Sequence, residues 1–198
     1  AVLRGVESAL EAAGTKSPTL ISLGGHPATH ILGETFYSQV PLRWGDYVAK
    51  VSVAPLSPEL TELTGTAIEL AHAPDALRNA VANFFAEHAG TWEVRAQLMT
   101  DPETMPIEDA SKPWSEEESP YVAIGRINVP RQDSWSDAKV KTIDDGAAFN
   151  PWHCLAAHRP LGSIMRARQA IYPRSAAFRA EHNRCPIHDM RSLAEVGG

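Results

Sequence analysis

The sequence predicts an α+β fold that contains part of an antiparallel β-sheet. Four segments have strand signals, two of them with clear alternation, and they form two pairs along the chain. Segments with helical periodicity separate the two pairs, and a loop followed by helical sequence makes up residues 149–198. Because strands with one buried face need a partner sheet or must close into a barrel, we expect half of an antiparallel β architecture.

Composition and charge narrow the class of protein. The chain has 198 residues, 43% hydrophobic and 21% charged, which is ordinary for one globular domain or a large piece of one. Its formal net charge of −6 provides no broad basic field, so nucleic acid is not an expected partner. No apolar run approaches the roughly 18 residues needed to span a bilayer, so no membrane is expected as a partner either.

Two features predict a cytoplasmic location. Residues 1–20 lack the basic start and apolar core of a secretory signal. Cys154 and Cys185 do not make a disulfide framework, which favours a reducing compartment.

The first half of the chain is expected to form a helix, a loop and a hairpin over residues 1–55, and helices over 56–90. Apolar residues recur with helical spacing over 2–13, and glycines indicate a loop over 22–29. The expected strands of the whole chain are Ile31–Leu42, Tyr47–Val53, Trp92–Met99 and Tyr121–Val129. The turn Trp44-Gly45-Asp46 is expected to join the first two of these strands. Helices are expected around Leu60–Leu63, Ala67–Leu70 and Asp75–Phe85, and Asp75 should cap the last of them.

The second half is expected to carry two strands and a long loop over residues 91–148, then a helix and tail over 149–198. The loop Asp101–Glu118 is acidic and contains three prolines, and Asp133–Asp145 is polar and irregular. A helix should begin near Leu161. Pro173 should kink or end that helix near Tyr172, leaving a second helical piece over residues 175–182.

Arg168 and Tyr172 are four residues apart, which on a helix places both side chains on one face. A guanidinium beside a phenol favours the phenolate form, and a tyrosine oxygen is one of the known axial ligands of haem iron. The same spacing also occurs where an arginine simply stacks on the ring of an ordinary helix.

Histidines and cysteines offer two further metal-site hypotheses. His26 and His30 have the spacing of a metal pair, although Pro27 argues against a helix between them. A zinc site could also be drawn from residues near the C-terminus, namely His153, Cys154, His182, Cys185 and His188. The alternatives are loop hydrogen bonding at His30 and buried, hydrogen-bonded roles for His153 and His158.

Several motifs, taken in order, resemble the C-terminal half of the haem catalase core, and most closely the shorter catalase-related proteins. The motifs are Tyr47–Pro55, Trp92–Met99 with its Gln-Leu-Met run, Met105–Trp114, Tyr121–Val129 with Gly125-Arg126, and Phe149-Asn150-Pro151. They end in the family's proximal pattern, Arg-x-x-x-Tyr followed seven residues later by arginine, which here is Arg168, Tyr172 and Arg179.

The resemblance implies the second half of a catalase-like antiparallel β-barrel, with about four strands, a wrapping loop at Met105–Trp114 and a proximal helix. It implies that haem b is the cofactor and that hydrogen peroxide is decomposed. Tyr172 is then the ligand of the haem iron and Arg168 the residue that holds it as phenolate. Arg179 pairs with a haem propionate, and Ile164 completes the cofactor-binding residues.

The chain also departs from the family pattern. Pro173 fits, but the Thr-His pair that follows the tyrosine in typical catalases is replaced by Ser175 and Ala176. The family's distal histidine lies in an N-terminal half, so we expect this chain to be a partial domain over 1–198 that needs that half, or a homo-oligomeric partner. Two other functions stay open, a haem enzyme acting on organic or lipid hydroperoxides and a non-enzymatic interaction fragment.

Overall fold

The computed structural model describes residues 28–70, 73–184, 188–190, 192 and 195. The helix expected over 2–13, most of the loop expected over 22–29, and the side chains of His26 and Cys185 lie outside this part of the chain.

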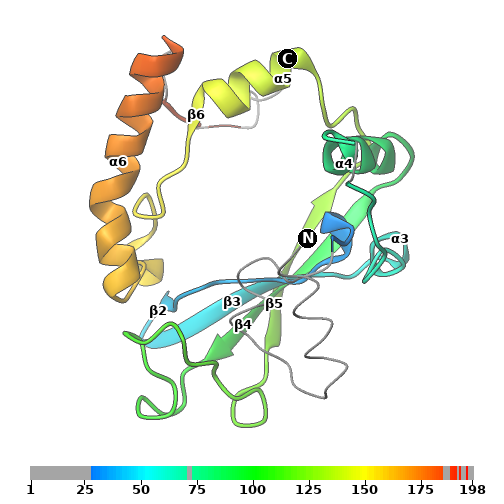
Figure 1. The fold of residues 1–198 in the computed structure, drawn as a ribbon. Helices are drawn as coiled ribbons and strands as arrows, with labels where there is room; N and C mark the ends of the chain where they lie inside the picture. Colours follow the sequence, from blue (N-terminus) through cyan, green and yellow to red (C-terminus); the bar gives the residue numbers. More distant parts are fainter. Residues whose placement is uncertain (1–27, 71–72, 185–187, 191, 193–194, 196–198) are drawn as a thin grey trace, which may run out of the picture.

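A five-stranded antiparallel sheet forms the lower part of the fold as drawn in Figure 1. Its strands are β1 (Phe36–Tyr37), β2 (Leu42–Trp44), β3 (Tyr47–Pro55), β4 (Gly90–Leu98) and β5 (Val122–Val129). β1 and β2 both pair with β3, β4 pairs with the other edge of β3, and β5 follows β4. Among the described strands the sheet is open, and a bulge at Ile124 interrupts the pairing of β4 with β5.

The predicted hairpin is present, but the strand expected over Ile31–Leu42 is wrong for most of its length. Gly45 makes the turn between β2 and β3 with a φ of +63°, which suits glycine. Ile31–Gly33 forms a short 3-10 helix, η2, because the His30 side chain accepts a hydrogen bond from the Leu32 N–H. A Cβ at Gly33 would lie 2.5 Å from the Leu63 carbonyl carbon, so two backbone segments meet here.

The apolar core lies where two helices meet the sheet. α3 (Pro58–Thr61) and α4 (Ala76–Glu87) supply Leu60, Phe84 and Phe85, which pack with Trp92 of β4. Asp75 precedes α4 as predicted, although its carboxylate pairs with Arg78 at 2.7 Å and does not cap the helix.

The helix expected over Ala67–Leu70 is wrong. This segment uses its backbone to pair with residues 28–30, because Ile68 N donates to Ala28 O at 2.8 Å and His30 N donates to Thr66 O at 2.9 Å. Tertiary pairing therefore overrides the local preference of this apolar stretch for a helix.

The long loop after β4 covers the polar side of the sheet. The buried Gln97 amide donates to the carbonyl oxygens of Trp114, Ser115 and Ser119, at 3.3, 3.3 and 2.9 Å. The Lys50 ammonium lies 4.7 Å from the Trp114 ring centroid. Burial lowers the pKa of Lys50, and the ring offsets part of that cost.

The remaining elements lead to the C-terminal helix. The stretch predicted to be irregular contains α5 (Asp137–Val140) and one π-helical turn, η3 (Lys141–Asp145), and Ser136 caps α5 through the Lys139 N–H. Then come β6 (Ala147–Ala148), the 3-10 turn η4 (Ala156–His158), α6 (Ser163–Asn183) and β7 (His188–Asp189), which pairs in parallel with β6. In Figure 1, α6 stands across from α4, with the sheet below and α5 above.

α6 continues through Pro173, so the predicted helix end near Tyr172 is wrong; residues 175–182 are helical as predicted, but they belong to the same helix. Proline removes the hydrogen bond to the carbonyl of Gln169, four residues earlier. Pro173 and Gln169 are both exposed, so water can bind the freed carbonyl and the helix need not stop. No helix in the described ranges combines the length and the apolar character required to cross a bilayer.

Replacing Gln97 with Met should destabilise the fold by about 1–3 kcal/mol, because three carbonyl groups would lose their buried donor. Urea unfolding with an unchanged m-value would measure this loss. The control is Gln132→Met, whose exposed amide donates to the carbonyl of Pro130 two residues away and should change stability by less than about 0.5 kcal/mol. Equal effects of the two variants would contradict the role of Gln97.

Tyr121 should ionise at a clearly higher pH in the folded protein than in the unfolded chain. Burial raises the pKa of Tyr121 to about 12, and the neighbouring Tyr37 and Glu116 add to the effect. The folded protein therefore keeps a proton on Tyr121 that the unfolded chain releases near pH 10. The contribution of this group to the free energy of unfolding is complete below about pH 10 and is lost towards about pH 12. Tyr121→Phe should remove the step near pH 12 from the phenolate absorbance titration.

Candidate functional site

Backbone hydrogen bonds to the sheet fix the start of α6. Arg43 N donates to Arg159 O and Gly45 N to Ala157 O, both at 2.9 Å, and Leu161 N donates to Pro41 O at 3.2 Å. Residues 157–161 therefore run beside β2 as an added edge segment. The His158 ring stacks on Trp44 of β2, with ring centroids 4.7 Å apart and ring planes inclined by 14°. This side-chain contact also holds residues 157–161 against β2.

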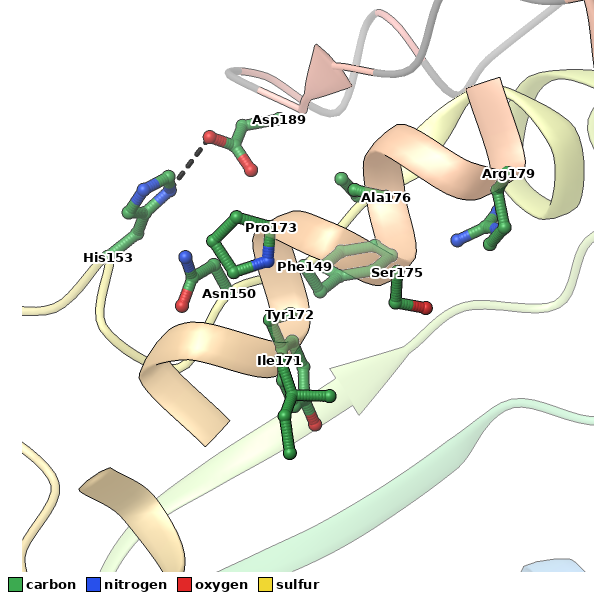
Figure 2. Close-up of a pocket in the computed structure, with 11 residues that line it drawn as sticks. Phe149, Asn150, His153, Ile171, Tyr172, Pro173, Ser175, Ala176, Arg179 and Asp189 are labelled. Carbon is green, nitrogen blue, oxygen red and sulfur yellow. Dashed lines mark ion pairs between the residues drawn. The ribbon is translucent and has the colours of Figure 1, made fainter. Parts of the chain in front are cut away.

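A cavity of about 600 Å³ lies along the second half of α6 (Figure 2). It is lined by residues from β6 and the loop after it, from α6 and from β7. These residues are Ala148, Phe149, Asn150, His153, Ile171, Tyr172, Pro173, Ser175, Ala176, Arg179 and Asp189. Residues more than 30 positions apart in sequence thus form one site.

Tyr172 is the half-buried phenol of this cavity. Its hydroxyl makes no hydrogen bond to any residue that the structure describes. Figure 2 shows it pointing away from His153 and Asp189. The oxygen is therefore available to a ligand.

Arg179 lies two turns beyond Tyr172 and lines the same cavity. Its guanidinium donates to the carbonyl oxygen of Asp144 in η3, which joins α6 to the π-helical turn. This places a fixed positive charge at the rim of the cavity, where it could meet an anionic group of a ligand.

The structure does not bring Arg168 and Ile164 into the cavity. Arg168 donates to Gln39 Oε1 at 2.9 Å and to Met165 Sδ at 3.5 Å, and within the described residues it makes no hydrogen bond to Tyr172. Ile164 lies half-buried in the first turn of α6. Arg168 thus connects α6 to the segment before β2.

A contact that the sequence does not reveal joins two residues of the cavity lining. His153 Nδ1 lies 2.7 Å from Asp189 Oδ2, which connects the loop after β6 to β7. His153 and His158 were expected to be buried, but both are exposed, and each is engaged by one partner, Asp189 or Trp44. No sequence signal links His153 to Asp189, because they are 36 positions apart.

The metal-site hypotheses gain no support from the described residues. His30 Nδ1 accepts a hydrogen bond from Leu32, and burial lowers the pKa of His30. The His182 ring stacks on Phe178, and the described part of the chain contains no group of three or more potential metal-ligating side chains.

The fold is similar to that of solved catalases. A fungal catalase aligns with a TM-score of 0.60 and 21% identity, over 80% of this chain and 33% of its own length. Catalase A from Saccharomyces cerevisiae aligns with a TM-score of 0.59 and 19% identity, over 78% and 33% of the two chains. A bacterial catalase aligns with a TM-score of 0.57 and 17% identity, over 89% and 35%.

This chain therefore spans about a third of the length of these catalases, and the predicted resemblance is confirmed for the fold. No protein-family model and no curated protein matches the sequence.

Proposed function

We propose that this chain forms the proximal part of a haem-binding, catalase-like protein that decomposes hydrogen peroxide. The observation that carries the proposal is the cavity on α6, which holds Tyr172 and Arg179 within a catalase-like fold. Their spacing along one helix is that of the family's iron ligand and propionate-binding arginine.

The residues of the cavity suit haem b. Tyr172 offers an oxygen donor without a protein partner in the described residues, and a phenolate is a suitable ligand for ferric iron. Phe149 and Ile171 are 70% and 57% exposed although both line the cavity. Apolar side chains so exposed are typical of a surface that a ligand or partner covers.

Each residue then has a specific task. When bound, haem supplies the redox chemistry of peroxide decomposition. Tyr172 holds the iron through its phenolate oxygen, and Arg179 pairs with a propionate carboxylate. Arg168 acts from the turn before Tyr172, where its charge favours the phenolate and its bond to Gln39 holds the helix.

We further propose that the distal acid–base group comes from outside this chain. The fold likeness extends over about a third of a catalase, and peroxide chemistry needs a proton-transfer group within about 3 Å of the substrate. An N-terminal half of the core, or a second copy of the chain, would supply it. Oxygen release from hydrogen peroxide should therefore be low for the haem-loaded chain and rise when the partner is added.

Replacing Tyr172 with Phe should abolish the ferric–phenolate absorption of the haem complex, since the variant has no oxygen donor at that position. The matched control is Tyr47→Phe, because Tyr47 is 65% exposed at the start of β3 and does not line the cavity. A Tyr172→Phe variant with the spectrum of the unmodified protein would show that Tyr172 is not the ligand.

Replacing Arg168 with Ala should weaken haem binding about tenfold, the equivalent of roughly 1.4 kcal/mol, because the phenolate loses a nearby positive charge. Arg168→Lys should restore only part of the affinity, since an ammonium lacks the planar fork that reaches Gln39. Arg174→Ala removes an exposed arginine of the same helix and is the control. Absorption titration with haem measures all three, and equal affinities would contradict the role of Arg168.

The substrate is tested separately. Oxygen release from hydrogen peroxide, compared with turnover of a fatty-acid hydroperoxide by the assembled protein, distinguishes a catalase from an enzyme of organic hydroperoxides. A purified protein that takes up no haem would instead favour the interaction fragment.

A further inference from the structure

We propose that Glu108 is a positioning residue for the helix that carries Tyr172. The inference deepens the proposed function, because it names a contact that orients the first turn of α6 once backbone pairing has set where the helix begins. Glu108 belongs to the loop between β4 and β5 and lies 64 positions before Tyr172, outside the cavity.

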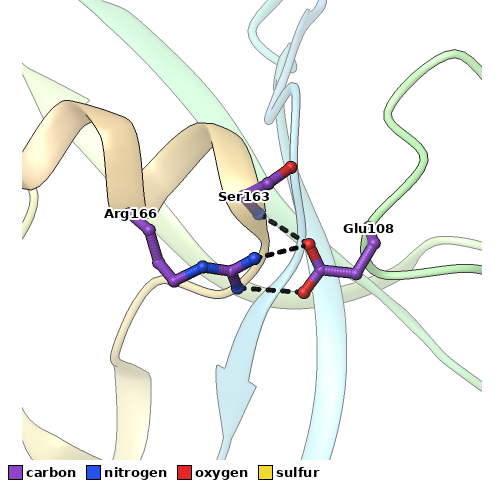
Figure 3. A network of polar contacts seen from close by, with 3 residues as sticks. All are labelled: Glu108, Ser163 and Arg166. Atoms are coloured by element: carbon purple, nitrogen blue, oxygen red, sulfur yellow. Dashed lines mark hydrogen bonds and ion pairs between the residues drawn. The ribbon is translucent and has the colours of Figure 1, made fainter.

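Glu108 makes three contacts with the first turn of α6 (Figure 3). Its Oε2 accepts a hydrogen bond from the Ser163 backbone N–H at 2.8 Å. The Arg166 guanidinium forms a fork with the same carboxylate, with Nη1 3.0 Å from Oε1 and Nη2 2.9 Å from Oε2. One side chain therefore binds both the backbone and a side chain of the helix start.

The helix start lacks a capping side chain of its own. Gly162 stands at the N-cap with a φ of +86°, so it has no oxygen to offer the unpaired N–H groups of the first turn. The Glu108 carboxylate supplies that acceptor, and its negative charge also suits the positive end of the helix dipole. A carboxylate contributed by a distant loop thus replaces the missing cap.

The backbone of the loop also lies against the helix start. A Cβ placed on Gly162 would lie 2.9 Å from the carbonyl oxygen of Ile107. Glycine at this position therefore allows the close approach that brings Glu108 within reach of Ser163. The φ and the contact are two independent reasons for glycine here.

α6 has few other fixed points. Among its described side chains only Met165 is buried, so apolar packing does not set its orientation. The other ties are Trp152 Nε1 to the Met165 carbonyl at 3.0 Å, Arg168 to Gln39, and Arg179 to Asp144. Glu108 connects α6 to the long loop, and Gln97 of β4 binds the same loop to the sheet.

The first test measures amide hydrogen exchange of residues 161–172 in the protein without haem. Glu108→Ala should speed exchange at least about fivefold in this segment, and Glu108→Gln should have a smaller effect, since its amide oxygen can still accept from Ser163. Glu117→Gln changes an exposed glutamate of the same loop and should match the unmodified protein. Unchanged exchange in Glu108→Ala would overturn the proposal.

A double-variant cycle identifies the partner. Arg166→Ala alone should speed exchange less than Glu108→Ala, because the bond to Ser163 remains, and the combined variant should resemble Glu108→Ala. Salt of about 1 M should reduce the protection in the unmodified protein but not in Glu108→Ala, because it screens an exposed ion pair. Independent, additive effects of the two substitutions would contradict the fork as the anchor.

The second test links the anchor to Tyr172. The haem affinity of Glu108→Ala should fall several-fold while Glu117→Gln keeps it, and Glu108→Gln should lie between them. If exchange changes as expected but no variant binds haem, the anchor stands and the proposed function fails. If haem binds equally to all variants although exchange changes, Glu108 holds the helix without positioning Tyr172, and the proposal is overturned.

Discussion

The backbone pairing of residues 157–161 with the β2 edge is the constraint on which the C-terminal half depends. Three main-chain hydrogen bonds there set the point from which α6 leaves the sheet. Main-chain bonds do not depend on side-chain identity, so the location of the helix start is set by topology. The contacts of Glu108, Arg168 and Arg179 then act on a helix whose origin is already defined.

The two faces of the sheet have different tasks. One carries Trp92 and meets the aromatic side chains of α4, so it supplies the apolar core. The other carries Lys50, Ser52 and Gln97, and the side chains of Lys50 and Gln97 bind the long loop. Because Glu108 belongs to that loop, the polar face is also connected to the first turn of α6. Both faces therefore contribute to stability, one through apolar packing and the other through buried hydrogen bonds to the loop.

Sequence periodicity predicted the long strands well and the short elements poorly. β3 and β4 were found from alternation, because each is long enough to show it, and the strand predicted over Tyr121–Val129 is present as β5. The strand predicted over residues 31–42 was wrong because a local hydrogen bond to the His30 side chain and the close approach of Gly33 to the Leu63 backbone decide the shape of its first residues. The helix end predicted near Pro173 was wrong because the free-energy cost of proline within a helix depends on whether solvent reaches the freed carbonyl. No local sequence pattern shows whether it does.

The residues of the candidate site also divide into those that the sequence could identify and those that only the fold brings together. Tyr172 and Arg179 were paired from sequence only through the resemblance to the catalase pattern, because the predicted end of the helix near Tyr172 would have separated them. The structure places both on α6, where they line one cavity. Glu108 contacts Arg166 and His153 contacts Asp189 across 58 and 36 positions of sequence, and only the fold brings these residues together.

The bulge at Ile124 lies in β5, which is an edge strand among the described strands of the sheet. A strand that adds to the outer edge of β5 must break its register there, so this edge discriminates among strands that could extend the sheet and disfavours uniform stacking of identical chains.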